Sequence, residues 1–306
     1  MSAGATGVTG GQYIEAEHVC SVGAELGEGP VWVVREAALW FVDILGRQLH
    51  RYEPASRRWR TWPAPERPGF IVPLRGGGFL VGLKNGLQCF DPQSGQFTHL
   101  AHVEPHLPGN RLNDGAVSPE GALWFGSMDE AEKEPSGCLY RLDEHGRAVA
   151  LDAGYTITNG PAFSPDGGIF YHTDTVQRVV YAFDRPTPAT LAGKRVFVRI
   201  EAGAGFPDGT AVDAQGCVWI ALWGGWGVRR YSPSGELLGI VRFPCANVTK
   251  VAFGGPDGCT VYATTAWKGL SPLGRAAQPL AGDLFGFRAD VPGSPASEVA
   301  LARLKD

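Results

Sequence analysis

The stretch Ala38-Leu39-Trp40-Phe41-Val42 is a short run of aromatic and branched residues, and similar runs recur along the whole chain. Such runs, bounded by Gly, Pro, Asp or Ser, are typical of short β-strands. Their central residues follow one another at intervals of 40 to 48 positions: Trp40, Leu80, Trp124, Tyr171, Trp219 and Tyr262. The sequence therefore contains six copies of one structural unit.

Each of these runs is followed by a second phrase in which polar and apolar residues alternate up to a turn, as in Leu49-His50-Arg51-Tyr52-Glu53-Pro54. This alternation is typical of outer strands with one face in water. A repeat of this length with several strands per unit indicates a propeller, because each sheet buries its faces only against its neighbours. We therefore predict an all-β, six-bladed β-propeller. The alternatives, a pair of β-sandwiches or a parallel β-helix, would need a domain boundary or a shorter period.

The repeats predict a single propeller domain over residues 13–306, preceded by a flexible N-terminal tail at residues 1–12. The apolar segment around Val19 to Val22 precedes the first unit, and we expect it to pair with the last blade and close the ring. Sustained helical periodicity is missing, so helices should be minor. The longest irregular stretches are candidate lids over one end of the channel, namely Ala101–Arg111, Asp129–Gly137 and Lys268–Gly282.

Composition excludes several classes of protein. With 306 residues, 44% hydrophobic and 19% charged, the chain is long and apolar enough to bury a full core. The net charge of −4 and the scattered basic residues predict no nucleic-acid partner and no membrane partner. We expect a cytoplasmic protein, a monomer or a weak homo-oligomer. No metal-type or disulfide-type spacing links the cysteines, which we expect to be free and half-buried: Cys20, Cys89, Cys138, Cys217, Cys245 and Cys259.

Oxygen-bearing residues stand at the start of four apolar runs, in the phrases Glu28-Gly29-Pro30, Asn113-Asp114-Gly115, Asn159-Gly160-Pro161 and Asp208-Gly209-Thr210. In a propeller the innermost strand of each blade lines the channel, so residues at its start converge although they are far apart in sequence. Asn247 takes the comparable place in the sixth unit, whereas the second unit offers only the apolar Pro68-Gly69-Phe70.

Two carboxylates with one or more amide oxygens form a hard, all-oxygen ligand set. Such a set suits Ca²⁺, Mg²⁺ or Mn²⁺ better than a structural zinc, although Fe(II) and Zn²⁺ also occupy open oxygen sites. We therefore expect one divalent metal ion, with positions left for water and substrate. The competing interpretation is that Asn-Gly and Asp-Gly only make turns, which accounts for the glycines better than for the glutamate.

Together, these phrases resemble the regucalcin/gluconolactonase family (senescence marker protein-like), whose members are six-bladed, metal-dependent lactonases. The resemblance rests on Leu26-Gly27-Glu28-Gly29-Pro30, Arg111-Leu112-Asn113-Asp114-Gly115, Thr158-Asn159-Gly160-Pro161 and Pro207-Asp208-Gly209, in family order. It implies that Glu28, Asn159 and Asp208 bind the metal, and that Arg111 and Asn113 bind sugar hydroxyls. The phrase Thr264-Thr265-Ala266-Trp267-Lys268-Gly269-Leu270 looks most like bacterial sugar lactonases such as xylonolactonase and arabinolactonase.

Other site residues follow from the same resemblance or from loop position. The family places an acidic residue of the loop after the inner strands of the third blade against the sugar, and here Asp129, Glu130 and Glu132 are the candidates. Asp208, or a water that it holds, is the candidate general base. Three tryptophans in apparent loops are candidates for stacking on the sugar, Trp223, Trp226 and Trp267, whereas four others are expected in the core, Trp32, Trp40, Trp124 and Trp219.

The resemblance implies a hydrolase that opens aldonolactones, such as xylono-, arabino- or gluconolactone, to the sugar acid in sugar catabolism. Two alternatives remain open at this point. An organophosphate or aryl-ester hydrolase on the same propeller would have an apolar pocket and would not need Arg111 and Asn113. A non-catalytic, calcium-binding propeller would bind metal without turning over a lactone.

Overall fold

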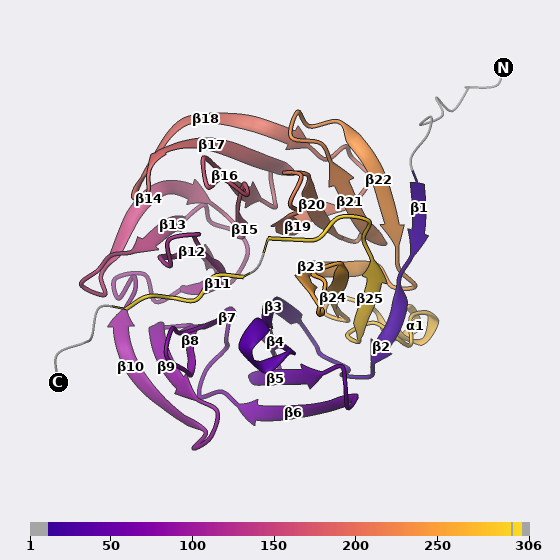
Figure 1. Ribbon diagram of the computed structural model, residues 1–306, viewed down its shortest axis with the longest axis horizontal. Coiled ribbons are helices and arrows are strands. Elements are labelled where there is room, and N and C mark those ends of the chain that lie inside the picture. Colours follow the sequence, from indigo (N-terminus) through magenta and orange to yellow (C-terminus); the bar gives the residue numbers. More distant parts are fainter. Residues whose placement is uncertain (1–11, 295, 302–306) are drawn as a thin grey trace.

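The computed structural model describes residues 12–294 and 296–301. Six β-sheets surround a central channel (Figure 1), and they confirm the predicted all-β, six-bladed propeller. Of the predicted N-terminal tail, residues 1–11 lie outside the described residues, and Gln12 is the first residue of strand β1 (Gln12–Glu15).

The first three blades each contain four antiparallel strands in chain order, with the first strand at the channel (Figure 1). Blade 1 consists of β3 (Gly27–Val33), β4 (Ala38–Asp43), β5 (Gln48–Glu53) and β6 (Arg58–Pro63). Blade 2 consists of β7 (Phe70–Pro73), β8 (Phe79–Leu83), β9 (Gly86–Asp91) and β10 (Gln96–His102). Blade 3 consists of β11 (Asn110–Val117), β12 (Leu123–Asp129), β13 (Gly137–Leu142) and β14 (Ala148–Tyr155).

The last three blades continue the pattern, and two of them recruit N-terminal strands. Blade 4 consists of β15 (Thr158–Phe163), β16 (Ile169–Asp174), β17 (Val179–Thr187) and β18 (Thr190–Arg199). Blade 5 consists of β19 (Phe206–Val212), β20 (Val218–Trp223), β21 (Gly227–Tyr231) and β22 (Leu237–Arg242), with β1 added outside β22. Blade 6 consists of β23 (Asn247–Gly254), β24 (Thr260–Ala266) and β25 (Leu284–Arg288), with β2 (Glu17–Cys20) outside.

The ring is closed by the N-terminal segment, as the sequence predicts. Strand β2 runs antiparallel to β25, with Glu17 opposite Gly286 and Cys20 opposite Leu284. The fourth strand of blade 6 therefore comes from the start of the chain, and β25 is not left as an open edge. The parallel pairing of β1 with β22 is an addition that the sequence did not predict.

Aromatic side chains pack between neighbouring blades and form much of the core. Trp40 of blade 1 lies 4.2 Å, centroid to centroid, from Phe79 of blade 2. Trp124 of blade 3 similarly lies 4.9 Å from Phe170 of blade 4. All four tryptophans predicted in the core are buried: Trp32, Trp40, Trp124 and Trp219. Each blade thus buries its faces against its neighbours, as the repeat requires.

Helices are minor, in agreement with the sequence. The described residues contain a 3-10 turn over Val34–Glu36 and one short helix, α1 (Pro272–Ala277), which Ser271 caps through its hydroxyl. None of the helices described is long and apolar enough to cross a membrane. All six cysteines are free; Cys138, Cys217 and Cys245 are fully buried, and the other three are half-buried as expected.

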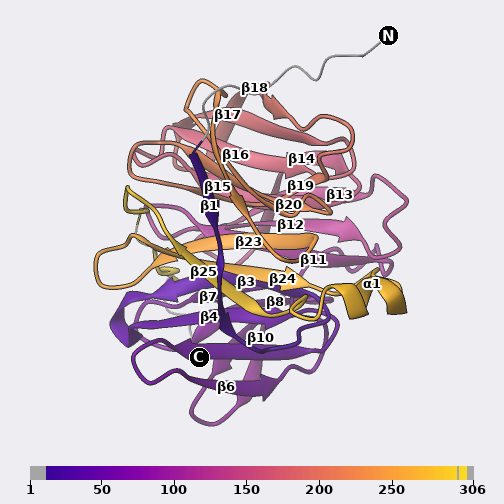
Figure 2. The same ribbon diagram turned by 90° about the vertical axis from the view of Figure 1, so that its right-hand side faces the viewer.

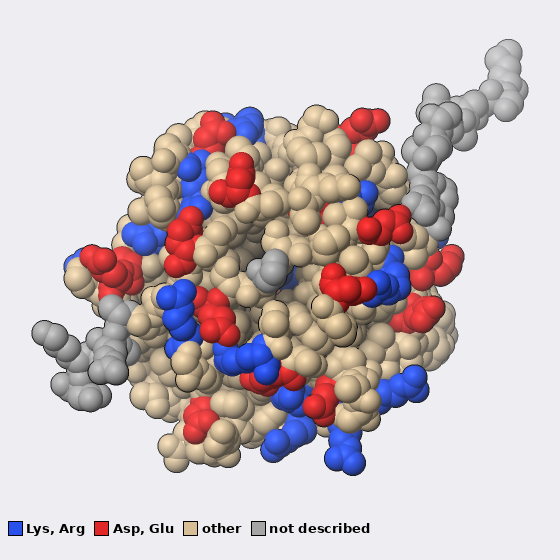
Figure 3. All heavy atoms as spheres, in the orientation of Figure 1, with Lys and Arg blue, Asp and Glu red and all other residues tan. Residues whose placement is uncertain are grey.

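The two ends of the channel differ. The C-terminal segment crosses one end, pairing Gly293 with Asp213 of the loop after β19 and Val299 with Leu74 of the loop after β7. In the side view, α1 lies on the opposite face (Figure 2). On the face that the C-terminal segment crosses, acidic and basic side chains are interspersed and no area of one sign dominates (Figure 3).

Candidate active site

A cavity of about 480 Å³ occupies the end of the channel nearer α1, and six of the eight predicted site residues line it. These are Glu28, Arg111, Asn113, Glu132, Asn159 and Asp208. They come from blades 1, 3, 4 and 5. Apart from Arg111 and Asn113, they are far from one another in the sequence. The predicted convergence of these residues on one pocket is therefore present, while their chemical roles stay predictions.

Interrupted strand pairing positions four of these side chains. The register of β3 with β4 shifts between Glu28 and Val31, and equivalent shifts follow Asn159 in β15 and Pro207 in β19. In β11 the shift spans Asn113 and Asp114. Such bulges free a residue from the regular alternation of a strand and re-aim its side chain.

The glycines of these phrases have a specific role at two of the bulges. Gly29 and Gly160 both have a φ of +55°, in the left-handed region that favours glycine. A Cβ on Gly160 would also lie 2.5 Å from Thr210 Oγ1 of the next blade. The oxygen-plus-glycine phrase is therefore the sequence of a bulge that brings an inner strand close to its neighbour.

Arg111, Asn113 and Asn159 form a chain of hydrogen bonds on one side of the pocket. The Arg111 guanidinium donates to Asn113 Oδ1 at 2.6 Å, and Asn113 Nδ2 donates to Asn159 Oδ1 at 2.9 Å. Asn159 Nδ2 donates in turn to Thr175 Oγ1 at 3.0 Å. These bonds fix the orientation of both amides. Each amide oxygen accepts a bond from the residue before it in this chain of bonds, and each amide nitrogen donates to the residue after it.

Arg111 is buried rather than part of a surface salt bridge. Burial lowers the pKa of its guanidinium to about 10, and the negative charges of Glu130, Glu132 and Glu28 oppose that shift. The side chain is therefore still charged at neutral pH. It provides a fixed cation at the wall of the pocket.

Glu28 and Asp208 are two buried carboxyls that act on one another. Burial, and then the charge of Asp114, raises the pKa of Glu28 to about 8, although the Gly29 N–H, Lys250 and Arg111 counteract this. Burial raises the pKa of Asp208 well above its ordinary range, and the charge of Glu28 adds to the effect. No described residue donates a hydrogen bond to Asp208, whereas Glu28 accepts one at 2.8 Å from the N–H of Gly29.

This donor set fits a divalent cation. Within residues 12–294 and 296–301, no three His, Cys, Asp or Glu side chains are grouped to hold a metal by themselves. Glu28 and Asp208 supply two carboxylates, so the Asn159 amide oxygen has to complete the set. A cation between two mutually repelling carboxylates, one of which lacks a donor, would remove the cost of burying them both charged.

The three acidic candidates of the loop after β12 have different positions. Asp129 accepts hydrogen bonds from the backbone N–H groups of Ala131, Lys133 and Glu134, which lower its pKa. Glu130 forms ion pairs with Lys84 of blade 2 and with Arg67 of the segment that leads into blade 2. Among the three, Glu132 lines the pocket, and it forms an ion pair with Lys268 of blade 6. The prediction of a substrate contact therefore narrows to Glu132, because the other two carboxylates are turned into their own loop or toward blade 2.

Apolar side chains form the walls above this polar floor. They belong to Leu26, Ile44, Met128, Ile157, Val176, Phe206 and Trp223. Of the predicted lids, Asp129–Gly137 and Lys268–Gly282 contribute Glu132, Lys268 and Gly269 to the pocket, while Ala101–Arg111 contributes its last residue alone.

The fold and this arrangement can be compared with known proteins. A family model described as the SMP-30/gluconolactonase/LRE-like region matches residues 26–267. The chain belongs to this family. The resemblance predicted from the sequence is thereby confirmed.

Curated members of the family include sugar lactonases. The chain is 37% identical over 271 residues to the 6-deoxy-6-sulfogluconolactonase of Pseudomonas putida, covering 88% of this chain and 92% of that protein. It is 39% identical over 265 residues to the L-arabinolactonase of Azospirillum brasilense, covering 85% and 87%. Its fold matches the crystal structure of regucalcin, described as a calcium-binding protein, from Agrobacterium tumefaciens, with a TM-score of 0.91 and 30% identity over 94% and 98% of the two chains.

In this member of the SMP-30/gluconolactonase family, one of the three candidate stacking tryptophans lines the pocket. That residue is Trp223. Trp226 is exposed outside the pocket, and the ring of Trp267 packs under the Arg275 guanidinium at 3.9 Å. Asn247 stands at the start of β23 as expected, but it binds the N–H of Gly224 and the carbonyl of Lys268, and so joins two loops instead of facing the pocket.

Sequence reasoning missed three polar residues of the site. Thr175 lines the pocket and accepts the bond from Asn159, while Asp114 and Lys250 form a buried ion pair of 2.5 Å. Asp114 stands next to Asn113 and could have been singled out from that phrase. Lys250 gives no such signal, because its partner is 136 positions away in the sequence.

Proposed function

We propose that this protein is a metal-dependent hydrolase that opens an aldonolactone to the corresponding sugar acid. The observation that carries the proposal is the meeting of Glu28, Asn159 and Asp208 beside the Arg111–Asn113 pair in one pocket. Relatives whose names state a sugar-lactone substrate, at 37% and 39% identity over most of the chain, support the same class of reaction.

In this proposal the chain's own residues hold the ion and orient the substrate. Glu28, Asn159 and Asp208 would bind a divalent ion, which supplies Lewis-acid activation of a carbonyl and lowers the pKa of a water. Arg111 donates to ring or hydroxyl oxygens of the lactone. The remaining hydrogen-bonding capacity of Asn113, and Glu132 at the rim, recognise hydroxyl groups.

The reaction adds water across the ring ester bond. The water oxygen bonds to the carbonyl carbon, the bond from that carbon to the ring oxygen breaks, and the ring oxygen leaves as a hydroxyl group. Asp208 takes a proton from the attacking water and returns it to the ring oxygen, which leaves the proton count unchanged.

A panel of aldonolactones tests the proposal. Metal-stripped protein is assayed with pentono- and hexonolactones after addition of Ca²⁺, Mn²⁺, Fe²⁺ or Zn²⁺, alongside Asp208→Asn and Glu28→Gln. We expect turnover that requires an ion and is lost in both folded variants. Activity in both variants like that of the wild type, or no turnover of any lactone, would contradict the assignment.

The apolar walls support a second candidate, an aryl-ester or organophosphate hydrolase at the same site. Seven apolar side chains surround a floor that carries the same carboxylates and Arg111. A sugar lactone and a phosphotriester, compared at matched metal loading with Arg111→Lys, separate the two candidates. The lactonase should lose lactone turnover in this variant, whereas an aryl-ester hydrolase would be little affected. Metal binding with no turnover of either substrate would instead indicate a calcium-binding propeller.

A further inference from the structure

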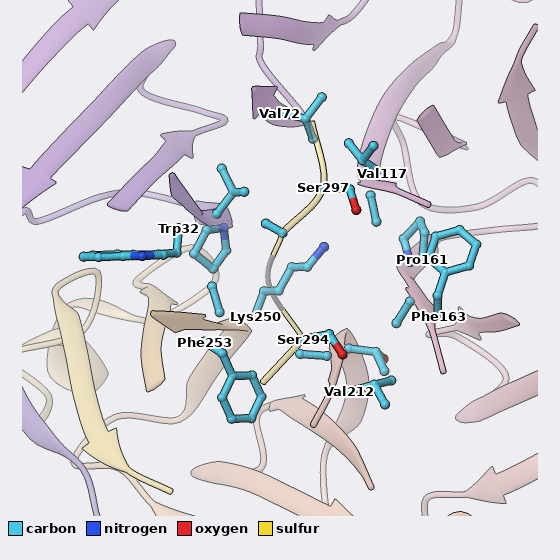
Figure 4. Close-up of a pocket in the computed structure, with 18 of the residues that line it drawn as sticks. Trp32, Val72, Val117, Pro161, Phe163, Val212, Lys250, Phe253, Ser294 and Ser297 are labelled. Atoms are coloured by element: carbon cyan, nitrogen blue, oxygen red, sulfur yellow. The ribbon is translucent and has the colours of Figure 1, made fainter. Parts of the chain in front are cut away.

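A buried ion pair crosses the channel below the pocket. Asp114 in β11 and Lys250 in β23 are 1% and 6% exposed, and Asp114 Oδ1 lies 2.5 Å from Lys250 Nζ. The two strands belong to blades 3 and 6, which face each other across the ring (Figure 1). The Lys250 side chain therefore extends through the middle of the channel, as Figure 4 shows.

The pair lies at the boundary between two cavities. A second cavity of about 490 Å³, lined by Lys250 and by Ser294 and Ser297 of the C-terminal segment, occupies the other end of the channel (Figure 4). Along β11, Asn113 lines the pocket and Gly115 lines the second cavity, with Asp114 between them. The ion pair therefore separates the candidate active site from the second cavity.

Asp114 and Lys250 contact the backbone directly beside two predicted metal ligands. Asp114 Oδ2 accepts a 2.8 Å hydrogen bond from the N–H of Gly160, which follows Asn159. The stem of Lys250 packs against Gly209, which follows Asp208, so closely that a Cβ on this glycine would lie 2.4 Å from Lys250 Cβ. The pair thus braces the two bulges that present Asn159 and Asp208.

The charges of Asp114 and Lys250 have opposite effects on the two carboxyls among the predicted metal ligands. Asp114 acts on Glu28 and Asp208 as a like charge, and Lys250 acts on both as an opposite charge. While the pair is intact, the two effects oppose one another, and that of Asp114 is the larger on both carboxyls. If either partner were removed, one full charge would be left uncompensated below the two carboxylates.

We propose that Asp114 and Lys250 are positioning residues that set the affinity of the site for its divalent ion. Lys250 keeps Asp114 from acting as a third negative charge on the cage, meaning the proposed ligands Glu28, Asn159 and Asp208. This inference rests on the proposed metal site, but it does not depend on which ester is hydrolysed. Neutralising Asp114 leaves a lysine cation below the cage and weakens ion binding. Removing the Lys250 charge leaves a carboxylate there and strengthens it.

Binding of Mn²⁺ to the metal-stripped full-length protein, measured by calorimetry at pH 8, tests the inference. Lys250→Met should bind Mn²⁺ at least roughly tenfold more tightly than the wild type, and Asp114→Asn more weakly by at least the same factor. The double variant should return close to the wild-type affinity. Lys194→Met is the matched control, because it removes a lysine paired with Asp152 in blade 3, away from the channel, and it should leave the affinity unchanged.

The opposite signs separate this role from a purely structural one. A scaffold pair would make both single variants bind Mn²⁺ more weakly, in step with lower unfolding temperatures, and that result would overturn the inference. Unchanged affinity in Asp114→Asn would overturn it as well, and Lys250→Gln supplies the arm of opposite sign if Lys250→Met does not fold. A wild-type protein that binds Mn²⁺ but opens no lactone refutes the proposed reaction alone, whereas one that binds no divalent ion refutes the inference.

Discussion

Raising the pH of the metal-free protein from 5 to 8 should remove the stability that the two buried, protonated carboxyls of the pocket contribute, Glu28 and Asp208. Burial and the charge of Asp114 raise the pKa of Glu28 from 4.5 to about 8. A carboxyl with a higher pKa in the folded state holds its proton more tightly when folded. Its stabilising contribution is therefore complete below the ordinary pKa of 4.5 and is lost as the pH rises through about 8.

The size of the effect follows from the shift. One pKa unit corresponds to about 1.4 kcal/mol, so Glu28 alone should remove roughly 3 kcal/mol between pH 5 and pH 8. Asp208 changes the stability in the same direction, because its pKa is also raised. The buried His50 and His172, whose pKa values are lowered, act in the opposite sense, but they do so equally in the wild type and in Glu28→Gln. With a typical urea slope, the unfolding midpoint of the wild type should therefore fall by about 1 M or more relative to that of Glu28→Gln over this range.

Urea unfolding followed by circular dichroism, in EDTA at pH 5, 6.5 and 8, measures this dependence. Glu28→Gln is the control: its amide can still accept the bond from the Gly29 N–H but has no charge to bury, so the Glu28 contribution to the pH dependence should be missing from its midpoint. Saturating Mn²⁺ should remove most of the dependence from the wild type. The reasoning is refuted if the metal-free wild type and Glu28→Gln show the same dependence on pH.

Three further predictions concern single residues. Arg111→Lys should lower kcat/KM for a lactone roughly 10- to 100-fold, because lysine cannot keep the geometry of the bond to Asn113, while the Mn²⁺ affinity stays unchanged. An equal loss of Mn²⁺ binding would contradict this. Gly160→Ala should lower the free energy of unfolding by at least about 1 kcal/mol, since alanine at φ +55° is strained and meets Thr210; an unchanged urea midpoint would count against it. His172→Phe should raise the free energy of unfolding by roughly 1 kcal/mol, because both nitrogens of this buried ring lack hydrogen-bond partners. Phenylalanine keeps the ring contacts with Tyr155 and Phe170. A lower urea midpoint would show that the imidazole is needed.

The six-bladed fold could be predicted because its cause is repeated in the sequence. Each blade needs a large apolar residue against the next blade, and Trp40 and Trp124 recur at that position with the period of the unit. Closure by β2 could be predicted because an apolar segment precedes the first unit. The pairing of β1 with β22 could not, since a four-residue edge strand held mainly by backbone bonds has no distinctive side-chain pattern.

The site divides in the same way. Glu28, Asn159 and Asp208 could be found because a bulge at the channel places a glycine directly after a polar residue that faces the pocket, and this leaves a recurring phrase in the sequence. The Asp129 carboxylate could not be placed, because whether it accepts bonds from its own loop depends on the path of residues 130–134. Lys250 could not be paired with Asp114, since no local rule states which residue faces a side chain across the channel.

Blade 2 contributes no described side chain to the pocket. Its inner strand β7 pairs with β8 without a register shift, whereas the inner strands of the other five blades all contain one. The regular strand brings Phe70 to the place where the others present polar groups, and its ring fills the space beside Gly115, where an added Cβ would lie 2.9 Å from Phe70 Cδ2. A sixth bulge with another oxygen would surround a cation with protein ligands. Blade 2 therefore offers no oxygen to the proposed cage of Glu28, Asn159 and Asp208, and a cage that protein ligands leave incomplete has positions for water and a substrate.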